Sequence, residues 1–313
     1  AYETLAFDPR SQLRPISVRP YPGGDYIVTF NATGGLFPYG GGIGRVASDG
    51  TPRWFRFDYT HHWANLAEDG TILVPGMRIG TAADGQRLPP RARCKSNRPM
   101  IDTLRVIDGD GAILREIDLY EALLDANFEG LLATTHNPCD PLHLNFVHPI
   151  GADATAGLTP GDYLVSLRNI SAVAVIDRIT GAVKRMIHGN FEHQHAAQHI
   201  GGSKIVLFDN WGGDLDGPAS QIVEIDLATG AERTVFPIPG GDQEIPDRFS
   251  LYAGTINLSP DRRRILTAYT WNGHGYEIDL ATGTLLGVYE NRHPTGGGET
   301  ARYYLFDLSY LLP

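Results

Sequence analysis

Histidine recurs at one position of an internal repeat in this chain of 313 residues. His62 lies ten residues before Ile72, and His195 lies ten residues before Ile205. His143 precedes the matching apolar run, GDYLVSL, after a longer turn. Because equivalent residues of stacked repeats recur periodically in space, this spacing predicts that the three histidines converge on one shared site.

Further polar residues are expected around these histidines. The same ten-residue spacing puts Ser17 and Thr255 at the equivalent position of two other repeats. Alignment of GDYLVSLRN with GSKIVLFDN sets Arg168 against Asp209 at the end of the next strand, which predicts that Arg168 lies near the histidines. The residues predicted to contact substrate are Ser17, Asn145, Thr255 and Asn169.

Three histidines and one arginine, with no acidic partner expected among them, fit two kinds of chemistry. A nucleophilic histidine can attack an electrophilic, anionic group while arginine holds its oxygens, which gives group transfer through a covalent imidazole intermediate. Three histidines can also hold zinc or iron. Position alone does not separate the two, and we predict neither a metal nor a cofactor. Four further histidines do not recur at the repeat position: His148, His188, His193 and His199. His193 is two residues from His195, so either of the two could be the site histidine of that repeat.

The elements that must position these residues are short strands. Five hairpin segments carry an aspartate before a turn, and another apolar run precedes each of them; the aspartates are Asp49, Asp108, Asp177, Asp226 and Asp279. Four short antiparallel strands per repeat are typical of a propeller blade. We predict an all-β fold, a single β-propeller domain over residues 1–313. Five blades are clear, and the N-terminal YETLAF and C-terminal ARYYLFDLSYL would meet in a composite sixth blade, with seven blades as the alternative.

Two insertions interrupt the repeat. Residues 80–99 are rich in Pro, Arg and Gly and are predicted to form a loop, and residues 118–141 carry apolar residues at helical spacing. Cys94 and Cys139, one in each insertion, either form a disulfide or remain reduced. Each insertion is either a covering element or part of the site.

Composition and charge narrow the partners. The net charge of −10 disfavours a nucleic-acid surface, and no apolar run is long enough to insert into a membrane. The N-terminal AYETLAF has no initiator Met and no signal peptide, and it fits a mature exported protein or a trimmed chain. We therefore expect a periplasmic or secreted protein that acts on a small molecule. The sequence gives no prediction of the oligomeric state.

The stretch from Asp140 to Asn210 resembles consecutive blades of the arylsulfate sulfotransferase family. It contains DPLHLNFVHPI, then GDYLVSLRNISAVAVIDRITGAVKRMI, then QHAAQHIGGSKIVLFDN, and HHWANLAEDGTILV is similar to an earlier histidine blade of that family. The resemblance covers most of the chain more weakly. Two departures are His195-Ala196, where His-Asp or His-Thr often follows, and the lack of the N-terminal dimerisation domain of large members.

This resemblance implies a six-bladed bacterial enzyme that moves a sulfuryl group between phenols without a nucleotide donor. His195 corresponds to the transiently sulfated histidine, His143 and Arg168 hold the sulfuryl oxygens, and His62 is the remaining active-site histidine. A phenolate would leave with help from His62 or His143. The alternatives are a lyase or metal-dependent enzyme that uses the same histidines on an aromatic compound, and a non-catalytic propeller that binds a small ligand.

Overall fold

The computed structural model describes residues 13–32, 41–212, 219–241, 245, 248–294, 300–302, 304–305 and 307–308. The chain divides into two compact units. Unit 1 contains Ala1–Ile150 and Pro160–Ile187, and unit 2 contains Gly151–Thr159 and His188–Pro313. The prediction that residues 1–313 form one domain stays a prediction.

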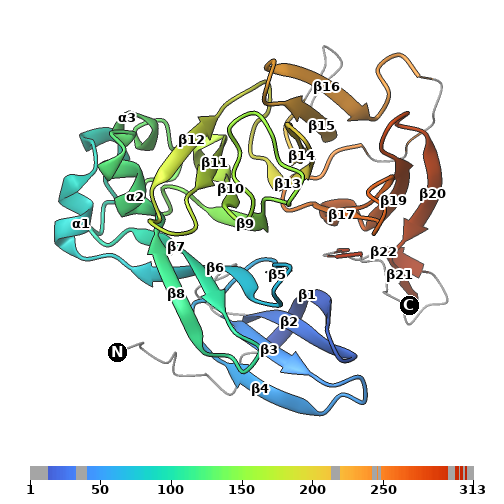
Figure 1. The fold of residues 1–313 in the computed structure, drawn as a ribbon, viewed down its shortest axis with the longest axis horizontal. Coiled ribbons are helices and arrows are strands. Elements are labelled where there is room, and N and C mark those ends of the chain that lie inside the picture. The colour runs from blue at the N-terminus through green and yellow to red at the C-terminus, as the bar shows by residue number, and fades with distance from the viewer. Residues whose placement is uncertain are drawn as a thin grey trace. The chain divides into compact units, whose positions relative to one another are not determined.

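Unit 1 contains three four-stranded antiparallel sheets, drawn in blue to yellow in Figure 1. The first consists of β1 (Leu13–Tyr21), β2 (Asp25–Ala32), β3 (Gly42–Val46) and β4 (Pro52–Arg56). The second consists of β5 (Asn65–Leu66), β6 (Ile72–Ile79), β7 (Met100–Ile107) and β8 (Ile113–Asp118). The third consists of β9 (Leu144–Pro149), β10 (Tyr163–Leu167), β11 (Ala172–Ile176) and β12 (Val183–Ile187).

Unit 2 contains two more sheets of the same kind. One consists of β13 (His195–Gly201), β14 (Lys204–Asp209), β15 (Gln221–Asp226) and β16 (Ala231–Phe236), and the other of β17 (Thr255–Leu258), β18 (Arg264–Tyr269), β19 (His274–Asp279) and β20 (Leu285–Glu290). In all five sheets, neighbours along the chain are neighbours in the sheet. This repeated four-stranded antiparallel unit confirms the predicted all-β propeller fold.

The prediction of six blades is wrong for the part of the chain that the structure describes, where five four-stranded blades are present. The C-terminal run does not supply a full blade, because β22 (Thr300–Arg302) pairs with the short β21 (Arg292–Pro294) in a two-stranded sheet. Beyond β22, the backbone N–H of Leu305 donates to the carbonyl of Thr270 at 3.2 Å. YETLAF lies outside the described residues, so the predicted meeting of the termini in one blade stays untested.

The aspartates of the repeat close the hairpin turns, as their position predicted. Asp177 Oδ1 accepts backbone N–H bonds from Ile179 at 2.8 Å and Thr180 at 2.7 Å. Gly181 then takes a φ of +80°, the left-handed conformation that glycine adopts without a steric penalty. Asp226 and Asp279 cap their turns through the same kind of bond.

The two insertions both contain helical segments. The predicted helix in residues 118–141 is present as α2 (Leu119–Asp125), followed by α3 (Glu129–Leu132), and Tyr120 and Leu123 are buried. The prediction of a loop over 80–99 is wrong in part, because α1 (Ala82–Arg87) and the 3₁₀ turn η1 (Pro90–Ala92) form there. The cause is a capping box, in which Thr81 and Asp84 satisfy each other's backbone N–H groups.

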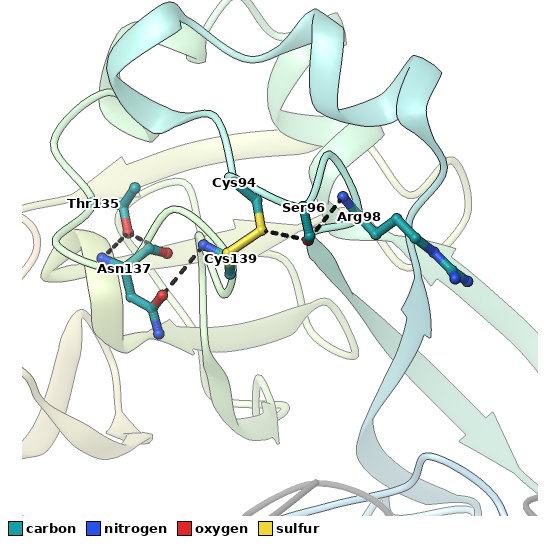
Figure 2. Close-up of a disulfide and its surroundings, with 6 residues drawn as sticks. All are labelled: Cys94, Ser96, Arg98, Thr135, Asn137 and Cys139. Atoms are coloured by element: carbon teal, nitrogen blue, oxygen red, sulfur yellow. Dashed lines mark hydrogen bonds between the residues drawn. A yellow bond between two sulfur atoms is a disulfide. The ribbon is translucent and has the colours of Figure 1, made fainter. Parts of the chain in front are cut away.

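A disulfide between Cys94 and Cys139 joins these insertions (Figure 2). It spans 45 residues of sequence and lies entirely in unit 1. The backbone carbonyl of Cys139 also accepts the N–H of Met100 at 2.8 Å, at the start of β7. Both a covalent bond and a strand contact therefore fix the residue that directly precedes Asp140. No helix within the described ranges is long and apolar enough to cross a membrane.

Candidate functional site

His62 and His143, which come from different blades of unit 1, lie together. Their ring centroids are 5.1 Å apart, in an edge-to-face arrangement. Both residues have positive φ values, +55° for His62 and +54° for His143. Non-glycine residues adopt this left-handed conformation at an energetic cost and retain it mainly where function requires it. The predicted meeting of these two histidines is confirmed within unit 1.

His143 has an acidic partner, which corrects the expectation that none was present. Asp140 Oδ2 lies 2.5 Å from His143 Nδ1, and the side chain of Asp140 is 4% exposed. An ionised carboxylate only accepts hydrogen bonds, so His143 Nδ1 carries a proton and donates it. The carboxylate thereby fixes the ring orientation and compensates positive charge on the imidazole when it takes up a second proton.

A second histidine–carboxyl contact lies beside His62. His61 Nδ1 is 2.6 Å from His62 Nδ1, and His61 Nε2 is 3.6 Å from Asp102 Oδ1. Burial lowers the pKa of His61 to about 3, so this ring is neutral near pH 7. Burial, aided by the charge of Asp140, raises the pKa of Asp102 well above its usual value.

Arg168 is connected to the same cluster through Asn169. Arg168 Nη1 donates to Asn169 Oδ1 at 2.8 Å, and Asn169 Nδ2 donates to the backbone carbonyl of Asp140 at 2.6 Å. Arg168 Nη1 also lies 3.5 Å from Nε2 of His136, an exposed residue of the second insertion. Asn169, which was predicted to contact substrate, uses both ends of its amide to hold Arg168 against the Asp140 segment.

Ser17 and Asn145 are buried in unit 1. Ser17 pairs with Thr29 in the β1–β2 ladder, and the hydroxyl of Thr29 donates to the backbone carbonyl of His62 at 2.6 Å. Asn145 lies at a β-bulge, because the pairing shifts between Leu144 and its second neighbour along β9. Bulges re-aim a side chain relative to the regular alternation of a strand.

His195 belongs to unit 2, where it begins β13 and is 2% exposed. Its Nδ1 lies 2.6 Å from Asn210 Oδ1 and 3.1 Å from the backbone carbonyl of His193. Asn210 Nδ2 donates to the carbonyls of Ser250 at 2.9 Å and Ala253 at 2.5 Å, which fixes Oδ1 as the acceptor end of the amide. Both neighbours of Nδ1 are therefore acceptors, so Nδ1 carries the proton and Nε2 of the neutral ring carries the lone pair.

Thr255 is equivalent to His195, as the ten-residue spacing predicted. His195 pairs with Phe208, which is three residues after Ile205, and Thr255 pairs with Ala268, which is three residues after Ile265. In its own blade, however, the Thr255 hydroxyl accepts the backbone N–H of Ala268 at 3.3 Å. Ser17 is one position out of register with these two, because β1 has an irregularity just before it.

Asp209 precedes Asn210 and supports the same turn. Its Oδ1 accepts the backbone N–H groups of Glu192 at 2.9 Å and Trp211 at 3.2 Å, and its Oδ2 accepts from Gln221 Nε2 at 3.0 Å. Burial raises the pKa of Asp209, because the charged form loses hydration. This carboxyl ties the segment before His195 to the end of β14.

Several residues of this site were missed in the sequence. His61 directly precedes His62, Asp140 stands three residues before His143, and Asn210 follows the aligned Asp209. The His-His doublet and the Asp-x-x-His spacing were therefore readable signals, whereas His136 and Asp102 had none. Across the described ranges, no group of three or more His, Cys, Asp or Glu side chains is arranged to hold a metal ion.

The sequence model of arylsulfotransferases (ASST) matches residues 46–283, which is most of the chain. The chain belongs to the arylsulfotransferase family. The matched range includes all the predicted site residues of this chain except Ser17. No curated protein matches the chain in sequence.

Similar solved structures support the fold of this chain and nothing beyond it. A protein of unknown function from Bacteroides caccae has a TM-score of 0.50 at 12% identity, over 89% of this chain and 82% of that chain. The RRP9 WD40 repeats have a TM-score of 0.51 at 9% identity, over 94% of this chain and 69% of that chain.

Proposed function

We propose that this protein transfers a sulfuryl group from an aryl sulfate to a phenol through a covalent intermediate on His195. The observation that carries the proposal is the hydrogen bonding of His195. Its Nδ1 lies beside two acceptors, Asn210 Oδ1 and the carbonyl of His193, so Nδ1 carries the proton and the lone pair of the neutral ring is on Nε2, the nitrogen that we propose as the nucleophile. Membership of the arylsulfotransferase family supports this reaction class.

In the first step, Nε2 of His195 forms a bond to sulfur while the bond from sulfur to the aryl oxygen breaks. The electron pair of that bond leaves with the phenolate, which takes a proton to become the free phenol. In the second step, the oxygen of an acceptor phenol attacks the same sulfur and loses its proton, and the nitrogen–sulfur bond breaks. No oxidant, reductant or nucleotide is consumed.

From the family resemblance, the charged cluster of unit 1 is proposed to bind sulfuryl oxygens and to protonate the leaving group. Arg168 presents a fixed fork of donors, which suits the sulfuryl oxygens as it suits phosphoryl oxygens. His143, supported by the Asp140 carboxylate, is proposed to deliver the proton to the leaving phenolate. His62 is proposed to hold a sulfuryl oxygen beside it.

The test uses 4-nitrophenyl sulfate as donor, with and without added phenol. Wild-type protein should release 4-nitrophenol faster when phenol is present, and His195→Ala should abolish the phenol-dependent release. With donor alone, the mass of the intact wild-type chain should increase by one sulfuryl group at neutral pH. Peptide mapping should place this group on a peptide that contains His195.

Two controls decide between this function and its rivals. His188→Ala changes a histidine outside the cluster, and it should leave transfer and the adduct unchanged. A chelator should also have no effect on transfer. Loss of activity on chelation with no adduct, or binding of aryl sulfate without any turnover, would exclude the proposed reaction.

We also propose that the protein works in an oxidising compartment, the periplasm or the exterior of the cell. The Cys94–Cys139 disulfide supports this, because such bonds persist where thiol-reducing systems are absent. Thiol trapping in fractionated source cells should recover the oxidised chain outside the cytosol. Recovery of a reduced chain in the cytosol would refute this location.

A further inference from the structure

Unit 2 carries a group of exposed aromatic side chains. Four of them are well exposed: Trp211 at 38%, Tyr252 at 53%, Trp271 at 43% and Tyr304 at 51%. Phe249 is half-buried among them. We call these five residues the aromatic patch. Contiguous exposed apolar groups commonly mark a ligand site.

The side chains of the patch contact one another as rings. Trp211 packs against Phe249 with centroids 5.5 Å apart, and Trp271 packs against Tyr252 at 5.2 Å and Tyr304 at 5.4 Å. The first two pairs are edge-to-face, and the third is tilted. Edge-to-face pairs leave ring faces available for stacking with a further aromatic group.

Backbone hydrogen bonds hold the two halves of the patch together. The hydroxyl of Ser250 accepts the backbone N–H of Trp271 at 3.1 Å and donates to the carbonyl of Tyr252 at 3.0 Å. Asn272 Nδ2 donates to the carbonyl of Phe249 at 3.4 Å. The backbone segments that carry the rings are therefore joined to one another, which reduces the entropy that binding must overcome.

Further hydrogen bonds connect the patch to His195. Asn210, which holds His195 Nδ1, also holds the segment that carries Phe249 and Tyr252, through the carbonyls of Ser250 and Ala253. Trp211 is the next residue after Asn210, and its ring contacts the ring of His193 at 5.6 Å. The carbonyl of His193 in turn accepts from His195 Nδ1.

We propose that the aromatic patch binds the ring of the aryl substrate, and that it makes the site select aryl over alkyl sulfates. The inference rests on the proposed function, because it takes the aryl sulfate from there. The occupant follows from the side chains: flat, π-rich surfaces stack with another flat ring, whereas an alkyl chain makes only dispersion contacts with them. Trp271, which contacts two other rings, is the residue on which the selection depends most.

The test measures binding without chemistry, by titration calorimetry with 2-naphthalenesulfonate. Its carbon–sulfur bond cannot undergo the proposed transfer. Trp271→Ala should weaken binding about ten-fold, the scale of one lost aromatic contact, and Trp271→Phe should restore most of the affinity. Tyr289→Ala is the matched control, because Tyr289 is exposed to 44% on β20 outside the patch, and its binding should match that of wild type.

Three comparisons separate the possible outcomes. Hexanesulfonate should bind more weakly than the naphthyl compound, and Trp271→Ala should change its affinity less than two-fold. The inference is overturned if Trp271→Ala binds both sulfonates like wild type, or if the variant instead dissociates an oligomer in sedimentation, which would assign the patch to a second copy of the chain. Failure of the sulfuryl adduct alone, with ring binding intact in wild type and in His195→Ala, would overturn only the proposed reaction.

Discussion

The histidines of unit 1 are held by ionisable groups, whereas His195 of unit 2 is held by an amide. Asp140 contacts His143, and Asp102 lies beside His61, so protons and charge can be exchanged within that cluster. Asn210 gives His195 a fixed proton position and no charge. A carboxylate partner suits a histidine that moves protons, and a neutral partner suits one that acts as a nucleophile.

Their surroundings differ in the same way. The unit 1 cluster includes Arg168 and two buried carboxyl groups, and it is rich in donors and acceptors. The segments bonded to His195 in unit 2 carry aromatic rings. Under the proposed function, the polar side chains of unit 1 are suited to managing charge, whereas unit 2 contains the proposed nucleophile and the aromatic patch. Four changes test this contrast between the units.

The largest effect is expected for Asn210→Ala. Loss of the acceptor allows His195 to adopt the other tautomer, and kcat should fall on the order of 10³-fold with little change between good and poor leaving groups. The matched control is Asn190→Ala, an exposed asparagine in the same unit. Nitrogen NMR of wild-type His195 gives a check that needs no variant: a ring protonated on Nε2 alone would contradict the Nδ1-protonated tautomer.

Removal of the disulfide should affect unit 1 selectively. A loop of this length stabilises the folded chain by about 4 kcal/mol through the restricted unfolded state. Cys94→Ser with Cys139→Ser should therefore lower the free energy of unfolding of unit 1 by about that amount. Hydrogen exchange followed by mass spectrometry in urea would show it, with dithiothreitol-treated wild type as the control. Equal loss of protection in β13–β20 would show that the units do not respond separately.

Asp140→Asn isolates the charge beside His143, because the amide oxygen can still accept from Nδ1. Proton delivery matters most for a poor leaving group, so transfer from phenyl sulfate should fall about 100-fold, and transfer from 4-nitrophenyl sulfate much less. Asp110→Asn, an exposed turn residue of unit 1, should have no effect. A loss that is equal for both donors would remove the proton-transfer role from this cluster.

The smallest effect concerns pH and stability. Below pH 6.5, His61 is protonated in the unfolded chain, whereas the folded residue, with a pKa of about 3, is neutral. The unfolded state therefore binds more protons, and the free energy of unfolding falls as the pH is lowered. Between pH 7 and 5, wild type should lose about 2 kcal/mol relative to His61→Gln in urea unfolding.

Asp102 contributes to the pH dependence of stability with the opposite sign, because its raised pKa favours the folded state at low pH and this contribution is lost as pH rises. Asp102→Asn removes this offsetting contribution, so its loss of stability between pH 7 and 5 should be steeper than that of wild type. Parallel curves for all three proteins would contradict both assignments.

The features that could be predicted from the sequence are those with a local cause. The hairpin aspartates use bonds to residues two or three positions away, and the equivalence of His195 and Thr255 follows from hairpins of similar length. The α1 helix was also readable, because Thr81 and Asp84 form its cap, but the Pro and Gly content of the insertion outweighed that signal.

The features that could not be predicted depend on distant segments. Asp102 stands in an apolar strand far along the chain from His61, and nothing in MIDTLRVI indicates that a carboxyl is buried there. The aromatic patch combines side chains from separate segments of unit 2, each of which reads alone as an ordinary core or surface aromatic. The two-stranded pairing of β21 with β22 likewise depends on which partner a terminal strand finds.

The contact between His62 and Trp63 makes the fluorescence of Trp63 sensitive to the state of His62. The two ring centroids are 5.7 Å apart, and Trp63 is 2% exposed, so its fluorescence should lie at short wavelength. An imidazolium quenches a neighbouring indole more strongly than a neutral imidazole does, so a change in the charge of His62 would change the emission of Trp63. Trp211 and Trp271 are exposed and should emit at longer wavelength. With the emission of the half-buried Trp54 subtracted, a spectrum can therefore report a charge change beside Trp63 separately from the arrival of a ring at the aromatic patch.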